Sequence, residues 1–286
     1  MCIRDSYRKI RGGNARGTVP SSALFLTTGV DKQRDRCYFV TRAWGEGGSS
    51  WLVDWGCCQQ RLSVDNTPIR NSDLNQLDEL VLNRSYPLVS PNAAGWPTLM
   101  TRLVGVDCGF ETHAVWNWVR KRDPNRVRAV AGDSQMDSLF YRMTVVEKSA
   151  RDGKPYEGGM QRWGINTGAY KTDIQTRWTQ PSYEPGAWLL TGDSVEILEF
   201  YLKQITNEGP LWTTNKHGRP CMSWTVLDAK LGNHYWDCEV YARALADMVT
   251  GGDWDGLLGR CPTNTVTSHE VSHRSYQDGG FASRDD

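Results

Sequence analysis

Two apolar segments of the sequence end on the same three residues, Gly-Val-Asp, and so place carboxylates at Asp31 and Asp107. A third acid, Asp237, lies near the start of a predicted helix, one position from its apolar stripe. If the strands ending at Asp31 and Asp107 are neighbours in one sheet, their ends bring the two carboxylates together. The covering helix can then add Asp237, so the pattern predicts one acidic site built from three elements.

Three carboxylates in a small volume repel one another and raise each other's pKa unless a cation lies between them. Hard oxygen ligands of this kind suit Mg²⁺ or Mn²⁺, which leave coordination positions open for phosphate oxygens. Two such ions about 3.5 to 4 Å apart can activate water and stabilise the leaving oxygen of a phosphodiester. We therefore predict that Asp31, Asp107 and Asp237 are both catalytic residues and ligands of two Mg²⁺ or Mn²⁺ ions.

Glycines flank the two strand-end acids. Gly29 and Gly105 each lie two residues before an aspartate, and Gly109 lies two residues after the second. They would leave room for a nucleic-acid backbone, although ordinary punctuation at strand ends explains them equally well. Each aspartate also has a structural alternative. Asp31 could start a turn, Asp107 could cap the next helix, and Asp237 could interact with the positive end of its helix dipole.

The elements that must position these acids alternate between strands and helices. An antiparallel meander is predicted from three β-rich runs separated by short turns, at residues 23–31, 36–45 and 49–58. A polar helix is predicted at residues 71–83. A strand, helix, strand unit with a right-handed crossover follows at residues 101–107, 111–122 and 126–133. This order predicts an α/β fold in which a meander is followed by parallel strands.

Further elements are predicted downstream. The sequence favours strands at residues 161–168, 187–190 and 221–227, and helices at residues 171–178 and 194–205, with a polar loop at 150–159. The last predicted helix, residues 233–249, carries Trp236, Val240, Ala244 and Met248 at a spacing of four, a stripe that must face the sheet. Most of the thirteen tryptophans lie in apolar segments, which favours core packing over base stacking.

Composition sets the limits of the fold and of its partners. The ends are basic or polar and Gly-rich, so we expect a flexible basic segment at 1–21, one folded domain at 22–250 and a flexible polar tail at 251–286. The opening residues look like a stray translated end, which suggests a fragment of a longer protein. With 33 basic and 33 acidic residues, DNA would have to be met by local basic patches.

The eight cysteines form no C-x-x-C pair, so neither a zinc site nor a disulfide framework is indicated and reduced thiols are expected. The sequence has no signal-peptide pattern and no apolar run long enough to span a bilayer, from which we expect a soluble intracellular protein.

Three motifs, in order, resemble the nuclease domain of the large terminase subunit of lambda-type tailed bacteriophages, the phage terminase GpA family, over roughly residues 10 to 250. The opening pattern Thr-x-Gly-Val-Asp-x-Gln, followed by Asp-Arg, occupies residues 27–36. The middle Asp and Gly are Asp107 and Gly109. The late Asp-Cys-x-x-Tyr-Ala pattern on a helix occupies residues 237–242. The chain departs from the family pattern at one point, since Asn233 is followed by His234 where many members have a glutamate before the last Asp.

The resemblance implies an RNase H-like mixed sheet with flanking helices. It also implies a metal-dependent endonuclease that cuts concatemeric double-stranded viral DNA during packaging, in the cytoplasm of the infected bacterial host. The expected partners are DNA, the small terminase subunit and the portal of the capsid. Large terminase subunits also carry an ATPase, but this sequence has no G-x-x-x-x-G-K-[ST] loop. We therefore expect the motor outside this chain, either upstream in a longer gene or on a separate polypeptide.

Candidate DNA contacts are a basic cluster after the helix predicted at 111–122, namely Arg120, Lys121, Arg122, Arg126 and Arg128. Such residues at a helix end equally offset its dipole and solvate a face. Lys171 is a weaker candidate at a helix start, where a phosphate would also meet backbone N–H groups. Two other functions stay open, namely a junction resolvase or integrase-like enzyme of the same fold, and a non-catalytic DNA-binding or assembly module.

Overall fold

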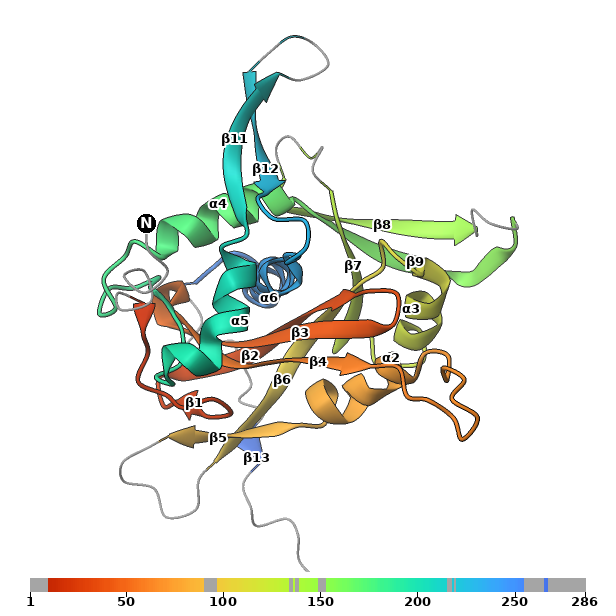
Figure 1. Cartoon of the computed structure of the whole chain (residues 1–286), viewed down its shortest axis with the longest axis horizontal. Coiled ribbons are helices and arrows are strands. Elements are labelled where there is room, and N and C mark those ends of the chain that lie inside the picture. The colour runs from red at the N-terminus through yellow and green to blue at the C-terminus, as the bar shows by residue number, and fades with distance from the viewer. Residues whose placement is uncertain are drawn as a thin grey trace, which may run out of the picture.

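The computed structural model describes residues 10–89, 97–133, 136, 139–148, 153–214, 218, 220–254 and 265–266. One mixed sheet forms its centre (Figure 1). In spatial order, the strands along this sheet are β10 (Trp188–Leu189), β4 (Ser50–Gln59), β3 (Arg36–Gly45), β2 (Ala23–Lys32), β6 (Thr98–Asp107), β7 (Val127–Gly132), β9 (Pro155–Ile165) and β8 (Tyr141–Lys148).

The order of the central strands confirms the predicted meander and the parallel strands beside it. Strands β2, β3 and β4 are antiparallel neighbours, while β6 lies parallel to β2 and β7 lies parallel to β6. The register pairs Val30 with Val106, so the next residues, Asp31 and Asp107, end adjacent strands at the same edge. Both faces of these strands are covered, which explains their nearly continuous apolar runs.

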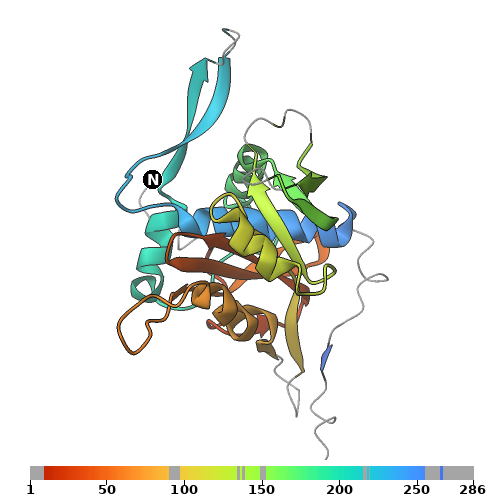
Figure 2. The same cartoon turned by 90° about the vertical axis from the view of Figure 1, so that its right-hand side faces the viewer.

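Helices cover the sheet on both faces (Figure 2). On one face, α2 (Ser72–Leu77), the π-helical turn η2 (Asp78–Leu82) and the crossover helix α3 (Thr112–Val119) share a core with β6 and β7. On the other face lie α4 (Thr167–Arg177), α5 (Val195–Ile205) and α6 (His234–Thr250). This strand order with a helix across each face is an RNase H-like fold.

Tryptophans fill this core, as predicted. Trp44, Trp188 and Trp236 are among the largest fully buried side chains. The predicted apolar stripe of α6 is buried, with Trp236, Val240 and Ala244 each 1% exposed or less. It does not face the sheet, however, because Cys238, Ala242 and Leu245 lie against β2 and β6. Trp236 instead packs on Trp178, at the end of α4, and on Trp224. The described helices include none with the length and apolar character needed to cross a membrane.

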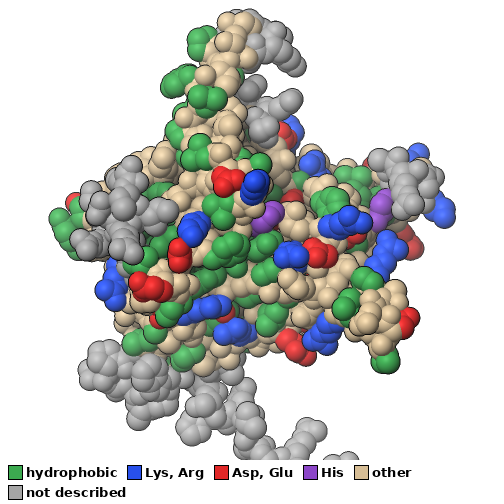
Figure 3. All heavy atoms as spheres, in the orientation of Figure 1, with side chains coloured by type: hydrophobic (Ala, Val, Ile, Leu, Met, Phe, Trp, Pro, Cys, Tyr) green, Lys and Arg blue, Asp and Glu red, His purple; other side chains and the backbone are tan. Residues whose placement is uncertain are grey.

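Short elements and one long ribbon complete the chain. The short elements are β1 (Val19–Pro20), the 3-10 turn η1 (Glu46–Gly48), β5 (Ser85–Val89) and β13 (Thr265–Val266). The ribbon is an antiparallel pair, β11 (Glu208–Thr214) and β12 (Pro220–Val226), which projects from the body. Figure 3 shows apolar side chains along it, and Leu211, Trp212 and Met222 are exposed there.

The structure differs from the predicted strands in three places. Strand β8 was not predicted, and β9 begins at Pro155, inside the loop expected at 150–159. The strand predicted at 221–227 pairs with the unpredicted β11 and not with the main sheet. Strands β8 and β11 are mostly exposed, so neither carries the buried apolar pattern on which sequence prediction relies.

Residues 10–20 contact the domain, although the sequence suggested a flexible segment there. Ile10 and Val19 are buried, and the Asn14 Nδ2 donates to the carbonyl oxygens of Thr18 and Leu52 at 3.1 and 2.9 Å. The few apolar residues in 10–20 show no periodicity, so the sequence alone does not predict these contacts. Of the expected tail, residues 255–264 and 267–286 lie outside the described part of the chain.

Helix α6 lies directly on β2 because Gly29 has no side chain. A Cβ atom at Gly29 would lie 2.0 Å from the Cys238 carbonyl oxygen and 2.8 Å from the Ala242 nitrogen, both backbone atoms of α6. Beside this contact, the Thr27 hydroxyl donates to the Ala242 carbonyl at 2.7 Å. On the same helix, the buried Glu239 carboxylate pairs with Arg42 of β3 at 2.9 Å. These contacts fix both the depth and the rotation of α6.

Substitution of Gly29 by alanine is expected to lower the free energy of unfolding by about 1 to 3 kcal/mol, because a backbone segment has to move away from the new methyl group. Urea denaturation followed by circular dichroism measures this change. Gly13→Ala is the control, since no atom lies within 4 Å of its added Cβ, and it should change stability by less than about 0.5 kcal/mol. Equal stability of both variants would contradict the assigned role of Gly29.

Candidate active site

The three predicted acids lie at adjoining ends of two neighbouring strands and one helix. Asp31 is in β2, Asp107 ends β6, and Asp237 lies in the first turn of α6. The charges of Asp31 and Asp237 both raise the pKa of Asp107, and Asp31 also raises the pKa of Asp237. The three carboxylates, from two strands and one helix, are therefore electrostatically coupled.

Burial is the main reason why two of these acids hold their protons unusually strongly. It raises the pKa of Asp107 to about 7, and the neighbouring charges add to this shift. The Gly109 N–H donates to Asp107 Oδ1 at 2.9 Å and acts in the opposite direction. Burial likewise raises the pKa of Asp237 to about 6, although the Lys171 ammonium opposes it. Near neutral pH the site is therefore poised to take up or release protons, or to exchange them for a cation.

Asp31 is held by two side chains. The Gln33 amide donates to both oxygens of Asp31 at 2.9 Å, and His234 Nδ1 lies 2.7 Å from Oδ2. The His234 ring stacks on Tyr38 with centroids 4.4 Å apart and planes 14° from parallel. His234, the residue that departs from the family pattern, thus contacts the first acid and occupies a defined place in the site.

Asp237 is held by a buried polar cluster that the sequence did not reveal. Lys171 Nζ lies 3.0 Å from Asp237 Oδ1 and 2.7 Å from Glu208 Oε2. Asn233 donates to Asp237 Oδ2 at 3.0 Å and also contacts Glu208. Glu208 is a single acid at the start of β11, and sequence reasoning missed it because its partners, Lys171 and Asn233, are distant in sequence.

Lys171 therefore does not occupy the phosphate-facing position suggested by the sequence. Helix α4 begins at Thr167, with the Asn166 side chain accepting from the Ala169 N–H, so Lys171 lies in the second turn. Its side chain is 8% exposed and faces the acids. The error came from placing the helix start four residues late, which made a buried cation look like a terminal one.

A second buried lysine, Lys32, forms ion pairs at the strand ends on the opposite face of the sheet. Lys32 follows Asp31 and points away from it, pairing with Asp73 and with Glu111, each at 3.0 Å. Because Glu111 lies in the loop after Asp107, this contact joins the end of β2 to the chain just beyond β6. No local sequence signal distinguishes Lys32 from the other charged residues of that turn.

The predicted basic cluster surrounds the start of β7, away from the carboxyl strand ends. Arg122 pairs with Asp78, its Nε lying 2.7 Å from Oδ1, and Arg126 donates to the Leu82 carbonyl at 2.6 Å. Arg120 and Lys121 are exposed, whereas the Arg128 guanidinium stacks on Trp163. Structural contacts thus account for Arg122 and Arg126.

The two flanking glycines of the strands serve packing. Gly29 admits the backbone of α6, and a Cβ at Gly105 would lie 2.9 Å from Leu245 of that helix. Neither contact leaves space for a nucleic-acid backbone at these positions, contrary to one of the two interpretations of the sequence. Close packing of α6 on the sheet therefore explains both Gly29 and Gly105.

The acids fit a hard divalent cation in their chemistry. Three carboxylates supply only oxygen ligands, and their mutual repulsion is what a bound cation relieves. Within the described residues, however, no group of three or more His, Cys, Asp or Glu side chains is arranged closely enough to hold an ion as it stands. The protein's own donors, including Gln33 and Lys171, contact the oxygens that an ion would use.

An RNase H-like sheet that gathers acids at the carboxyl ends of its central strands is typical of the nucleases of this fold. Residues 4–254 match the family model described as terminase large subunit gpA, endonuclease domain, and the chain belongs to this family. The resemblance noted in the sequence is confirmed, and the activity class is that of a hydrolase. No curated protein and no solved structure matched the chain.

Replacement of Lys171 by methionine is expected to lower the free energy of unfolding by about 3 kcal/mol, because Glu208 and Asp237 would remain buried beside each other without a cation. Chemical denaturation at neutral pH measures this loss. The matched control is Lys203→Met, which removes an exposed Lys-Glu pair on α5 and should cost less than about 0.5 kcal/mol. Equal effects of the two substitutions would exclude a structural role for the buried cluster.

Proposed function

We propose that this domain is a divalent-metal-dependent endodeoxyribonuclease that hydrolyses phosphodiester bonds of concatemeric double-stranded viral DNA. Family membership supplies the nuclease class. The observation that carries the rest is the electrostatic coupling of Asp31, Asp107 and Asp237 at adjoining ends of β2, β6 and α6. This coupling supports a shared catalytic role for the three acids.

In this proposal, Asp31, Asp107 and Asp237 hold Mg²⁺ or Mn²⁺, with two ions favoured by the number of carboxylates. Bound metal would supply Lewis-acid activation of water and of the leaving oxygen. The chain's own residues orient the acids, since Gln33 and His234 fix Asp31 and the Gly109 N–H fixes Asp107. Lys171 balances the charge of Asp237 and Glu208.

The proposed setting follows from the family. The substrate is double-stranded DNA, and the expected partners are the small terminase subunit, the portal and the ATPase domain of the full-length large subunit. The place of action is the cytoplasm of the infected bacterium. Among the sequence candidates for DNA contact, the exposed Arg120 and Lys121 remain available for phosphates.

Linear and supercoiled plasmid should be cut in Mg²⁺ or Mn²⁺ and left intact in EDTA. Asp31→Asn, Asp107→Asn and Asp237→Asn should each reduce the cleavage rate at least about 100-fold, because each removes a negatively charged ligand. Agarose gel electrophoresis of time courses measures the rates, and circular dichroism verifies that the variants fold.

The control for this experiment is Asp133→Asn, which follows β7 as the neighbouring strand-end acid and lies 3.6 Å from Arg142. It should retain the parent rate. Equal cutting by a folded Asp107→Asn protein would refute the assigned site. Cutting confined to branched DNA would instead favour a resolvase, and a parent protein that never cuts would favour a non-catalytic module.

Metal binding should also be measurable without cleavage. Mn²⁺ is expected to raise the thermal unfolding midpoint of the parent, because an ion that binds only the folded state stabilises it. Asp107→Asn should lose this rise, yet in EDTA it should be at least as stable as the parent, since it removes a buried, repelled carboxylate. An undiminished rise in the variant would show that the ion binds elsewhere.

A further inference from the structure

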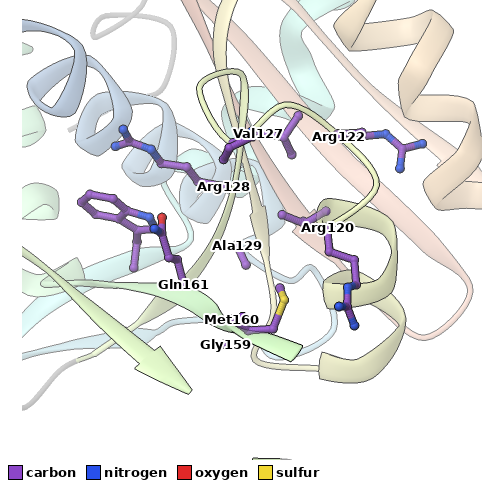
Figure 4. Close-up of a pocket in the computed structure, with 12 residues that line it drawn as sticks. Arg120, Arg122, Val127, Arg128, Ala129, Gly159, Met160 and Gln161 are labelled. Atoms are coloured by element: carbon purple, nitrogen blue, oxygen red, sulfur yellow. The ribbon is translucent and has the colours of Figure 1, made fainter. Parts of the chain in front are cut away.

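A cavity of about 220 Å³ lies at the start of β7, between the end of α3 and strand β9. In Figure 4, Arg128 extends to one side of the β7 strand, while Arg120 and Arg122 extend on the other side. Gly158, Gln161 and Trp163 of β9 also line it. A volume of this size holds more than a single water molecule, whose share of the liquid is about 30 Å³.

Two residues that line this cavity each carry a buried hydrogen-bond donor without an acceptor. Arg128 Nη1 and Trp163 Nε1 are both buried, and no hydrogen-bond partner reaches either one from the described residues. The guanidinium carbon of Arg128 lies 4.1 Å from the centre of the Trp163 ring, so the two donors belong to one stacked pair. Buried donors without partners are costly, and a native protein normally supplies their acceptors.

The charge of Arg128 is also uncompensated. Its neighbour Arg122 pairs with Asp78, whereas among the described residues no acidic side chain lines the cavity. Burial lowers the pKa of Arg128, and no carboxylate offsets this effect. A site with two donors, a cation and no anion requires a ligand that is negatively charged and accepts hydrogen bonds.

Arg128 faces the same side of the sheet as the proposed catalytic acids. Residues alternate along β7, so Arg128 shares a face with Val130, and Val130 pairs with Asp107. Two residues along a strand and one strand across correspond to roughly 8 Å between the Cα atoms of Arg128 and Asp107. One strand of duplex DNA rises 3.4 Å per nucleotide, so about two or three nucleotides span this distance.

We propose that this cavity binds a phosphate of the DNA backbone and so positions the duplex relative to the acids. This inference rests on the proposed function. Arg128 supplies the charge, and the Trp163 indole both stacks on the guanidinium and donates its own N–H. The exposed Arg120 and Lys121 add positive potential near the opening. Of the basic cluster predicted from sequence, Arg128 is thus the specific phosphate ligand.

The test is binding of a labelled duplex in EDTA, where no cutting occurs, over a series of salt concentrations. Arg128→Gln should weaken binding roughly tenfold and reduce the slope of log affinity against log salt by about 0.9. Trp163→Phe keeps a ring for stacking but loses the donor, so it should bind about threefold more weakly with an unchanged slope. Lys203→Gln removes the same charge from the exposed side of α5, which does not line the cavity, and should change affinity by no more than about twofold.

Thermal unfolding verifies that each variant folds, and the cleavage assay on the parent separates this inference from the proposed function. If the parent cuts and Arg128→Gln binds as tightly as the parent, the phosphate site is refuted while the nuclease stands. If the parent binds with the expected variant effects but never cuts, the nuclease proposal fails and the site stands. Equal losses in Arg128→Gln and Lys203→Gln, or no binding by the parent, overturn the inference.

Discussion

The site depends on the direct contact between the backbones of α6 and β2 at Gly29. The missing side chain lets the helix lie on the strand, and the Thr27 hydroxyl and the Arg42–Glu239 pair prevent it from sliding or rolling. Because Asp237 is on that helix and Asp31 is two residues after Gly29 on that strand, the same contact sets the separation of two acids. The helix–strand interface that buries the core therefore also fixes the distance between Asp31 and Asp237.

Around this contact, charge balance is achieved inside the protein. Lys32 and Lys171 are both buried beside pairs of carboxylates, one on each face of the sheet. Buried ions of one sign are costly unless opposite charges accompany them, so the two lysines allow several acids to be gathered in a small volume. The acidic site is consequently assembled by the fold before any outside cation contributes.

Much of this arrangement could be predicted from local sequence, and the limit is physical. The Gly-Val-Asp strand ends and helix α6 were identified because buried apolar runs have a period that a single segment displays, although the side of α6 that faces the sheet was not. Glu208, Lys32 and the buried position of Lys171 were missed because a lone charge carries no period and their partners are distant in sequence. The separations run from 25 residues, between Glu208 and Asn233, to 79 residues, between Lys32 and Glu111. Strands β8 and β11 escaped for the related reason that exposed strands need no apolar pattern.

Several cations near the sheet pair with internal partners, namely Lys32, Lys171, Arg122 and Arg126. With 33 basic and 33 acidic residues, the chain has no net positive charge with which to attract phosphates. Its residence on DNA would then be brief when it diffuses alone. Covalent or non-covalent attachment to another chain that binds the duplex would raise the effective concentration of DNA at this domain. In the proposed function, DNA binding by that other chain would then precede cutting.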